Sequence, residues 1–140
     1  MEDNIKVLIQ NAMDVRKNSY CPYSNYAVGA SILADDGEIY TGANIENASI
    51  GGTICAERSA MTNACSKGAR LIKIIAIVGG KVNSDEDEMD WAFPCGICRQ
   101  FLNEFANEET IVVVAKSSED YKIYKFYDLL PNAFGPNNLG

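Results

Sequence analysis

The sequence predicts an α/β fold, a three-layer α-β-α sandwich around a central mixed sheet of five strands. Two observations carry this prediction. The apolar patterns follow the order helix, strand, strand, helix, strand, helix, strand, strand. The 140 residues are 47% apolar and 22% charged, an ordinary globular mix at the length of one domain. We therefore expect residues 1–140 to form a single domain.

The first half of the chain contains a helix and a hairpin. Residues 2 to about 19 carry apolar side chains at spacings of three and four, which is typical of an amphipathic helix. We expect this helix to end before Pro22. Strands are expected over residues 26–34 and 38–43, because the Asp-Asp-Gly sequence at 35–37 is a strong hairpin signal.

The second half alternates helices with buried strands. The polar stretch 44–53 is expected to be irregular, and the next helix runs from about Cys55 to Ser66. Ile72 to Val78 is an apolar, β-branched run, typical of a central strand covered on both faces. The remaining expected elements are a helix that begins near Gly96 and strands over residues 111–115 and 121–126.

Two segments are expected to lie outside the regular elements. Residues 79–90 contain a run of acidic side chains at 85–88, which we interpret as a solvated loop. A calcium site is the less favoured alternative, because the spacing is not that of an EF-hand loop. After Leu129 and Leu130 the chain continues as a tail rich in Gly, Pro and Asn.

Charge and composition exclude several classes of function. The chain has 12 basic and 19 acidic side chains, a formal charge of −7, and no dense Lys/Arg cluster, so we expect no nucleic-acid partner. It has no histidine, which excludes a Ser-His-Asp triad, a Cys-His dyad and imidazole metal ligands. No apolar run approaches the length of a membrane span, and the acidic N-terminus lacks a signal-peptide pattern. We expect a cytoplasmic protein that does not bind a membrane.

The five cysteines indicate a metal site rather than a disulfide framework, which an odd number without a secretion signal disfavours. Cys95 and Cys98 form a Cys-x-x-Cys pair, which is either a redox pair or half of a zinc site. The redox interpretation is less favoured, because the pair lies two-thirds along the chain after the acidic segment. Without histidine, the other ligands must be cysteines or carboxylates. A structural site closes with four ligands, whereas a catalytic site uses three and leaves one position for water.

Cys55 is the favoured third ligand, because it begins a predicted helix just as Cys95 does. Cys65 lies about 15 Å further along the same helix, at a rise of about 1.5 Å per residue, and hardly reaches the same metal. Cys21 remains a less favoured fourth ligand. Two helix N-termini would stabilise the thiolates through their free N–H groups and dipoles.

The net charge of such a zinc site suggests roles for the charged residues next to the cysteines in the sequence. Three thiolates and Zn²⁺ sum to −1, which would weaken zinc as a Lewis acid. Arg58 could hydrogen-bond the sulfurs and offset this charge, and Arg99 is a second candidate. Glu57 is then the natural proton carrier between water and substrate. Taken alone, Glu57 would be interpreted as an exposed acid that stabilises a helix dipole.

Five stretches, in order along nearly the whole chain, resemble the small, homotetrameric, zinc-dependent cytidine deaminases. A ligand-x-Glu sequence followed by Pro-Cys-x-x-Cys, with the Glu unligated, is also the general pattern of the zinc deaminases. The stretches are Pro22–Ala30 (PYSNYAVGA), Asn44–Ser49 (NIENAS), Cys55–Arg58 (CAER), Pro94–Gln100 (PCGICRQ) and Leu129–Pro136 (LLPNAFGP).

The resemblance implies a reaction and a zinc site. The reaction is hydrolytic deamination of cytidine and deoxycytidine to uridine and deoxyuridine plus ammonia, in pyrimidine salvage. One Zn²⁺ per subunit would be held by Cys55, Cys95 and Cys98. Glu57 would carry a proton from water to N3 of the cytosine ring and then protonate the departing amino group, while Arg58 would offset the thiolate charge.

The resemblance also implies the contacts with the nucleoside. Asn44 and Glu46 would hydrogen-bond the ribose hydroxyls, and Phe134 would stack on the base from a neighbouring subunit of a homotetramer. An alternative for Phe134 is that it fills the core of its own domain. The other implied contacts are Tyr26 lining the base pocket, the backbone of Ala56 at the pyrimidine edge, and Ala48 and Ile50 supplied across subunit boundaries.

Departures from the family pattern keep two alternatives open. Tyr26 stands where the family usually has Phe, and Ile50 where it commonly has an aromatic residue. The change at Ile50 affects sugar affinity and substrate breadth, so deamination of another aminated heterocycle, such as blasticidin S, is one alternative. The other is a catalytically silent protein with structural zinc, which would need Cys21 or Cys65 as a fourth ligand. The acidic segment 79–92 is also longer than usual, without an assigned function.

Overall fold

The five strands form one mixed sheet, as the sequence predicts. The computed structural model describes residues 1–140, apart from the side chain of Glu86. The strand order is β2-β1-β3-β4-β5; β3 and β4 run parallel, and all other neighbours are antiparallel. The strands are β1 (Tyr26–Ala34), β2 (Ile39–Ala43), β3 (Ile72–Lys81), β4 (Ile111–Ser117) and β5 (Asp120–Lys125).

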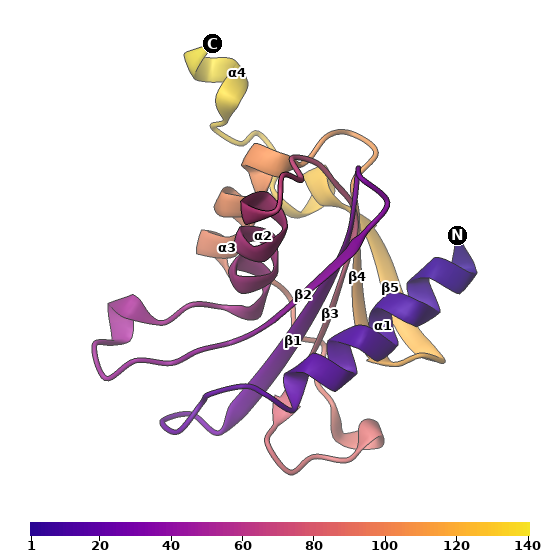
Figure 1. The fold of residues 1–140 in the computed structure, drawn as a ribbon, viewed down its shortest axis with the longest axis vertical. Coiled ribbons are helices and arrows are strands. Elements are labelled where there is room, and N and C mark those ends of the chain that lie inside the picture. The colour runs from indigo at the N-terminus through magenta and orange to yellow at the C-terminus, as the bar shows by residue number, and fades with distance from the viewer.

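Helices cover both faces of the sheet and complete the predicted three layers (Figure 1). One face is covered by α1, and the other by α2 and α3. Short 3-10 turns occupy residues 50–52, 86–88, 103–105 and 126–129. The helices are α1 (Glu2–Arg16), α2 (Ala56–Ser66), α3 (Gly96–Leu102) and α4 (Pro136–Leu139).

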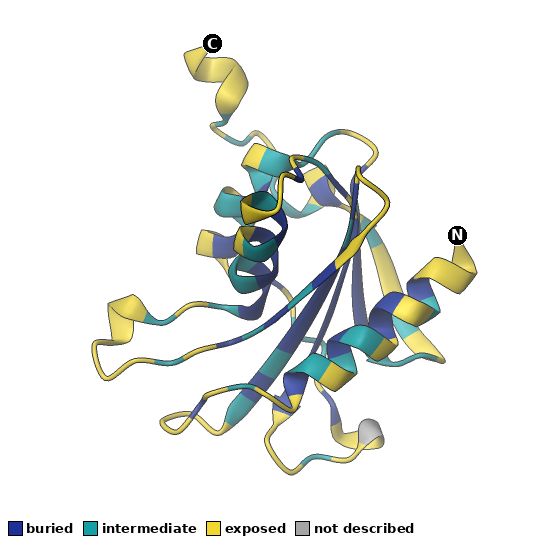
Figure 2. Cartoon of the chain, viewed as in Figure 1, coloured by how far each residue is buried: buried dark blue, intermediate teal, exposed yellow. Residues whose placement is uncertain are grey.

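Two cores lie on the two faces of the central strands, which are the most deeply buried part of the chain (Figure 2). In β3, Ile74, Ala76 and Val78 face α1, while Ile75 and Ile77 face α2 and α3. This burial on both faces is the reason that the sequence of β3 is continuously apolar. The parallel neighbour β4 is reached through the crossover that contains α3.

Two glycines allow the helices to lie directly on the sheet. A Cβ atom at Gly29 would lie 2.0 Å from the carbonyl oxygen of Ala12 in α1. A Cβ atom at Gly42 would lie 2.3 Å from the backbone nitrogen of Ala60 in α2. Any larger side chain would therefore push the helix away from its strand.

Two elements end three residues away from the predicted position, and the other predicted boundaries agree with the structure to within two residues. Helix α1 ends at Arg16 rather than near residue 19, because residues 17–19 form a turn closed by backbone bonds to carbonyls 14–16. Strand β3 continues to Lys81 instead of ending at Val78, because residues 79–81 pair with residues 28–26 of β1. The two glycines at 79–80 hid this extension, since glycine is a weak strand signal.

The acidic run forms a short 3-10 turn at residues 86–88 instead of an irregular loop. Asp85 caps this turn, and its backbone N–H is bound in return by the Glu88 side chain. Asp85, Asp87 and Glu88 are exposed, as expected for a solvated acidic run. A search of the described part of the chain finds no helix with the length and apolar character needed to cross a membrane.

Candidate active site

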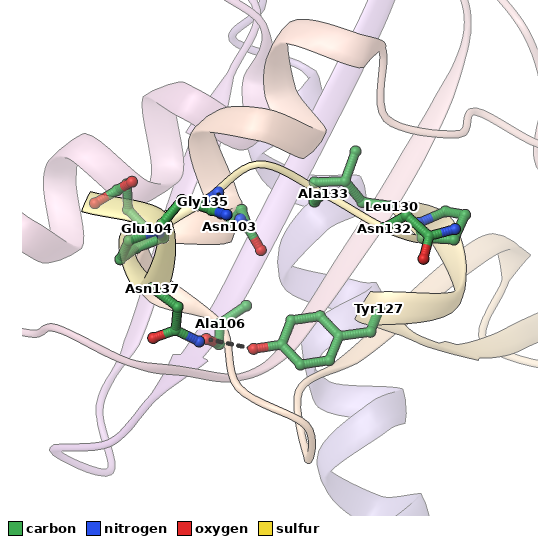
Figure 3. Close-up of a pocket in the computed structure, with 12 residues that line it drawn as sticks. Asn103, Glu104, Ala106, Tyr127, Leu130, Asn132, Ala133, Gly135 and Asn137 are labelled. Atoms are coloured by element: carbon green, nitrogen blue, oxygen red, sulfur yellow. Dashed lines mark hydrogen bonds between the residues drawn. The ribbon is translucent and has the colours of Figure 1, made fainter. Parts of the chain in front are cut away.

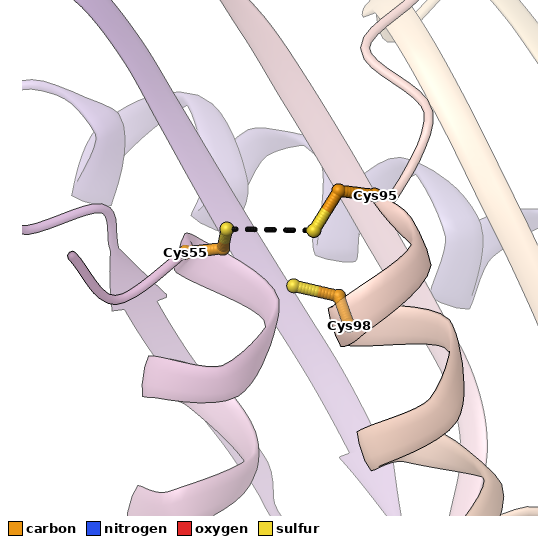
Figure 4. A group of neighbouring side chains, drawn as sticks. All are labelled: Cys55, Cys95 and Cys98. Carbon is orange, nitrogen blue, oxygen red and sulfur yellow. Dashed lines mark hydrogen bonds between the residues drawn. The ribbon is translucent and has the colours of Figure 1, made fainter. Parts of the chain in front are cut away.

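Three cysteines converge where α2 and α3 begin (Figure 4). Cys55 is the N-cap residue of α2 and Cys95 is the N-cap residue of α3, while Cys98 lies in the first turn of α3. The Sγ atoms of Cys55 and Cys95 are 3.8 Å apart, and all three Sγ atoms lie within 4.8 Å of one another. The structure thus brings together the three residues that the sequence predicts as metal ligands.

The donor set and its spacing fit a zinc ion. Two thiolates that bind a tetrahedral zinc at about 2.3 Å lie about 3.8 Å apart, which agrees with the Cys55–Cys95 separation. Because α2 and α3 both begin here, the dipoles of two helices favour negative charge on the sulfurs. Cys55, Cys95 and Cys98 are therefore suited to holding Zn²⁺ with one coordination position left for another ligand.

The remaining two cysteines lie outside this cluster. The Sγ atom of Cys65 accepts a hydrogen bond from Arg70 Nη1 at 3.2 Å, near the end of α2. Cys21 is buried in the turn before β1, where its carbonyl oxygen binds the backbone N–H of Asn25. Among the described residues, neither joins the three-sulfur group. The cluster therefore has the ligand count of an open site rather than of a closed four-cysteine site.

Arg58 contacts the metal-site sulfurs, whereas Arg99 does not occupy the place considered for it. Arg58 Nη2 lies 3.7 Å from the Sγ of Cys55 and donates to the carbonyl of Thr53 at 3.1 Å. Arg99 instead donates to the carbonyl oxygens of Pro94 and Leu129, each at 2.8 Å. Its guanidinium thereby joins the segment before α3 to the segment before the tail. Arg58 is thus the cation that faces the sulfurs.

Hydrogen bonds within the cluster separate the acidities of its thiols. A hydrogen bond from Cys98, with further bonds from Arg58 and Cys95, lowers the pKa of Cys55 to about 5. The same contact with Cys55, together with burial, raises the pKa of Cys98. Of these two thiols, Cys55 is accordingly the more ready to bind a cation as thiolate.

Glu57 lies in the first turn of α2, two residues after the ligand Cys55, and is only 4% exposed. Burial raises the pKa of its carboxyl to about 7. The structure therefore differs from the exposed, dipole-stabilising acid that Glu57 alone would suggest. A buried carboxyl with a pKa near 7 both accepts and donates a proton readily at neutral pH.

Asn44 holds the first residues of β1, and Glu46 holds the turn that precedes this strand. The Asn44 side chain accepts from the backbone N–H of Val28 and donates to the carbonyl of Tyr26, each at 2.9 Å. The Glu46 carboxylate accepts the backbone N–H of Tyr23 at 2.9 Å and that of Ser24 at 3.1 Å. Sequence reasoning missed this supporting role.

Serine side chains complete the same unit. The hydroxyl of Ser24 donates to the Glu46 carboxylate and accepts the backbone N–H of Tyr26. The hydroxyl of Ser19 donates to the Asn44 side chain. The signal that could have predicted these contacts is the pair of polar segments, one with Ser19 and Ser24 and the other with Asn44 and Glu46, because such side chains readily bind nearby backbone groups.

The residues predicted to reach other subunits are exposed. Ile50 is 85% exposed and lies with Ala48 in the segment after β2, which extends away from the sheet (Figure 1). Phe134 is 60% exposed, so the alternative in which it fills its own core is wrong. Its carbonyl oxygen accepts a hydrogen bond from Gln100 of α3 at 2.9 Å, which sequence reasoning did not foresee.

The tail is separated from the rest of the chain by a cavity of about 470 Å³ (Figure 3). Tyr127 and Ala106 line its inner side and are joined by a hydrogen bond of 3.4 Å from the tyrosine hydroxyl. Residues 130–133 and 135–138 form the opposite wall. Phe126, Leu129 and Leu130 hold the start of the segment after β5 in the core beneath α2 and α3, and the Gln100–Phe134 bond joins its later part to α3.

Comparison with protein families gives a match to the sequence around the cluster. The model described as the cytidine and deoxycytidylate deaminase zinc-binding region matches residues 2–115. This range contains Cys55, Glu57, Cys95 and Cys98.

Curated relatives match over almost their whole length. The cytidine deaminase of Sporosarcina psychrophila is 38% identical over 136 residues, which cover 97% of this chain and 95% of the relative. The cytidine deaminase of Halalkalibacterium halodurans is 40% identical over 134 residues, which cover 96% of each chain.

Solved structures match the fold as well. The crystal structure of cytidine deaminase from Burkholderia pseudomallei has a TM-score of 0.80 and 38% identity, and the match covers 91% of this chain and 97% of that one. The corresponding values for cytidine deaminase from Mycobacterium tuberculosis are 0.77, 36%, 92% and 95%. The sandwich and the sequence are thus similar to the same group of proteins.

Proposed function

The chain belongs to the cytidine and deoxycytidylate deaminase family, and we propose that it catalyses the hydrolytic deamination of cytidine and deoxycytidine. The products are uridine or deoxyuridine and ammonia. The observation that carries this proposal is the juxtaposition of three cysteine sulfurs with a buried carboxyl, Glu57, two residues after one of them. The enzyme is accordingly a hydrolase that acts on the C4–N bond of cytosine.

The residues of the cluster divide the work of the site. Cys55, Cys95 and Cys98 hold one zinc ion per chain, and zinc, when bound, supplies Lewis-acid activation of water. Arg58 offsets part of the negative charge of three thiolates, so that the site does not become too electron-rich for this task. The backbone of Ala56, between Cys55 and Glu57, lies at the pyrimidine edge.

Glu57 moves the protons of the reaction. In its carboxylate form it accepts a proton from the attacking water and delivers it to N3 of the ring, which makes C4 more electrophilic. It then takes the second proton from the hydroxyl group added at C4 and passes it to the amino nitrogen, so that the C4–N bond breaks, ammonia leaves and the C4 carbonyl of the product forms. A pKa of about 7 suits this alternation, because neither protonation state is strongly favoured at neutral pH.

The polar unit before β1 recognises the nucleoside. Asn44 and Glu46 bind the ribose hydroxyls with the hydrogen-bonding capacity that remains beyond their contacts to the turn. Backbone groups of β1 and of the turn before it hold these two side chains, so that both side chains are preorganised for a sugar. Tyr26, whose backbone this unit fixes, lines the base pocket.

We propose that the active form is a homotetramer whose sites are shared between subunits. Ala48 and Ile50 in the extended segment and Phe134 in the tail are exposed or lie on projecting segments, which supports contacts with a second copy. In such contacts Phe134 stacks on the base in a neighbouring site. The five unpaired cysteines suit a reducing cytoplasm, where the enzyme would serve pyrimidine salvage.

Ultraviolet absorbance tests the reaction directly. Zinc-loaded protein is mixed separately with cytidine, deoxycytidine and blasticidin S, and the loss of the cytosine band is followed. The proposal predicts loss with both nucleosides. Loss with blasticidin S alone would replace the nucleoside by another aminated heterocycle, and no loss at confirmed zinc occupancy would contradict a deaminase of any of these substrates.

A further inference from the structure

Two consecutive side chains of α3 hold the chain after β5 at two points. Arg99 donates to the carbonyl oxygen of Leu129 at 2.8 Å, where the tail begins. Nε2 of Gln100 donates to the carbonyl oxygen of Phe134 at 2.9 Å, further along the tail. The helix that carries Cys98 therefore also carries the supports of the tail.

Asn103 extends this contact between α3 and the tail. It lies in the 3-10 turn that continues α3, and a Cβ atom at Gly135 would be 2.5 Å from its Nδ2 (Figure 3). Asn103 follows Arg99 by four residues and Gln100 by three, a spacing that brings side chains to one face of a helix. One face of α3 and of the turn after it thus contacts the tail.

The peptide group between Phe134 and Gly135 is bound at both of its polar atoms. Its carbonyl oxygen accepts the bond from Gln100, and its N–H donates to Oδ1 of Asn138 at 2.8 Å. The backbone N–H of Asn138 donates in return to the carbonyl of Gly135 at 2.9 Å, which closes the turn. Because a peptide group is planar, these two bonds fix its orientation and with it the direction of the Phe134 side chain.

The direction of the Phe134 side chain depends on this support of the backbone. The residue is 60% exposed and lies outside the helices and strands. An exposed side chain on such a segment would sample many directions, so that binding through it would cost conformational entropy. A backbone that is held in advance lowers this cost.

We propose that Gln100 is a positioning residue, which holds the peptide group after Phe134 and so presents the phenylalanine ring to the base in a neighbouring subunit. This inference rests on the proposed deamination of cytidine by a tetramer with shared sites. It gives α3 two roles, because the helix supplies ligands to the zinc site of its own chain and a support to the site of the next. Since the ring contacts the base rather than the water or the zinc ligands, the effect falls on KM rather than on kcat.

Steady-state kinetics of two Gln100 variants test the hydrogen bond. Gln100→Ala removes the side chain, and Gln100→Glu replaces the donor with a carboxylate of nearly the same size that cannot donate to a carbonyl. We expect both to raise the KM for cytidine about threefold to fivefold, as for the loss of one hydrogen bond, with kcat within about twofold of the wild type. A wild-type KM in Gln100→Glu would overturn the inference.

A double variant tests whether Gln100 acts through the ring. In the Phe134→Ala background, Gln100→Ala should raise KM no further, because no ring is left to position. Gln10→Ala is the matched control, since this exposed glutamine of α1 binds Asp14 instead of the tail, and its KM should be unchanged. An equal increase in the presence and absence of the Phe134 ring would overturn the inference. Wild-type turnover of cytidine is measured first and tests the proposed function separately.

Mixed tetramers separate this role from one in the zinc site of the same chain, since Gln100 lies two residues after Cys98. Chains with Gln100→Ala are co-expressed with differently tagged Glu57→Gln chains, and assemblies that contain both are isolated. Only the first chains have the proton carrier, and only the second have a supported tail. We expect a fraction of the active sites to regain the wild-type KM. The KM of Gln100→Ala in all active sites, or the failure of mixed assemblies to form, would overturn the inference.

A further readout does not depend on turnover. In protein labelled with fluorophenylalanine, the ¹⁹F NMR signal of Phe134, assigned by its loss in Phe134→Leu, should shift in Gln100→Ala and stay in place in Gln10→Ala. An unmoved signal in Gln100→Ala would show that this side chain does not hold the tail, whatever the substrate.

Discussion

Arg58 lies against the sulfur of Cys55, with Nη2 3.7 Å from Sγ, while the same nitrogen donates to the carbonyl of Thr53 at 3.1 Å. The two residues are one helical turn apart at the start of α2. Hydrogen bonds to the cysteine sulfurs raise the pKa of Arg58, so the guanidinium stays charged beside them. The N-cap and first turn of α2 thus carry Cys55, Arg58 and Glu57, the residues proposed as metal ligand, charge partner and proton carrier.

Replacing Arg58 should weaken catalysis more than folding. Arg58→Ala leaves the charge of the thiolates uncompensated, and we expect kcat to fall about 10-fold to 100-fold, the range typical of residues that support metal ligands. Arg58→Lys keeps the charge and should retain more activity. Turnover, zinc content and circular dichroism measure the three effects. Wild-type rates in Arg58→Ala would mean that the charge is offset elsewhere.

Zinc binding should depend on the three clustered cysteines alone. Cys95→Ala is expected to lose tightly bound zinc and turnover, whereas Cys65→Ala, which alters a cysteine bound to Arg70, should keep both. The wild type should contain one zinc per chain, and a chelator should remove activity that added zinc restores. Zinc retained at wild-type affinity in Cys95→Ala would contradict the ligand set.

Glu57 should make the zinc-free protein less stable as the pH rises. The carboxyl has a pKa of about 7 in the folded state against 4.5 ordinarily. The folded state therefore keeps a proton that the unfolded state releases, so this contribution is full below pH 4.5 and is lost as the pH rises through 7. This difference in pKa corresponds to roughly 3 kcal/mol.

Urea unfolding of zinc-free wild type and Glu57→Gln at pH 5 and pH 8.5 measures this effect. Glutamine does not titrate, so the variant should gain stability relative to the wild type at the higher pH by up to about 3 kcal/mol. Parallel pH profiles of the two proteins would show that burial does not perturb Glu57.

Phe134 should act across a subunit boundary. Phe134→Ala removes an exposed aromatic side chain and is expected to raise the KM for cytidine about tenfold or to weaken the tetramer. Leu139→Ala, at another exposed apolar position of the same tail, is the control and should change neither property. Sedimentation and steady-state kinetics separate the two effects. A variant with an unchanged tetramer and unchanged KM would remove Phe134 from the site.

The sequence predicts the sheet and the clustering of Cys55, Cys95 and Cys98 well because both leave short-range signals. The β-branched run at Ile72–Val78 marks the central strand, and ligand spacing at Cys55 and Cys95 marks two helix starts. The extension of β3 to Lys81 escaped prediction, because it depends on pairing with β1 rather than on its own glycines. Pairing between distant segments is not encoded in local propensity.

The hydrogen-bond partners of individual side chains were harder to predict than the cysteine cluster. Arg58 follows Cys55 by three residues and Arg99 follows Cys98 directly, but only the fold shows that Arg99 binds the carbonyls of Pro94 and Leu129 instead of the sulfurs. The hydrogen bond from Gln100 to the carbonyl of Phe134 likewise joins residues far apart in sequence. A guanidinium or a side-chain amide can form hydrogen bonds with many different groups, so sequence spacing alone does not select its partner.

The most direct test of the central claim is the rate of cytidine deamination by Glu57→Gln and wild-type protein at matched zinc content. The substitution keeps size and polarity but removes the proton carrier. We predict an intact fold and one zinc per chain, with kcat reduced by about 100-fold to 10,000-fold. Near-normal turnover in Glu57→Gln would show that another group moves the protons and would contradict the account of this site.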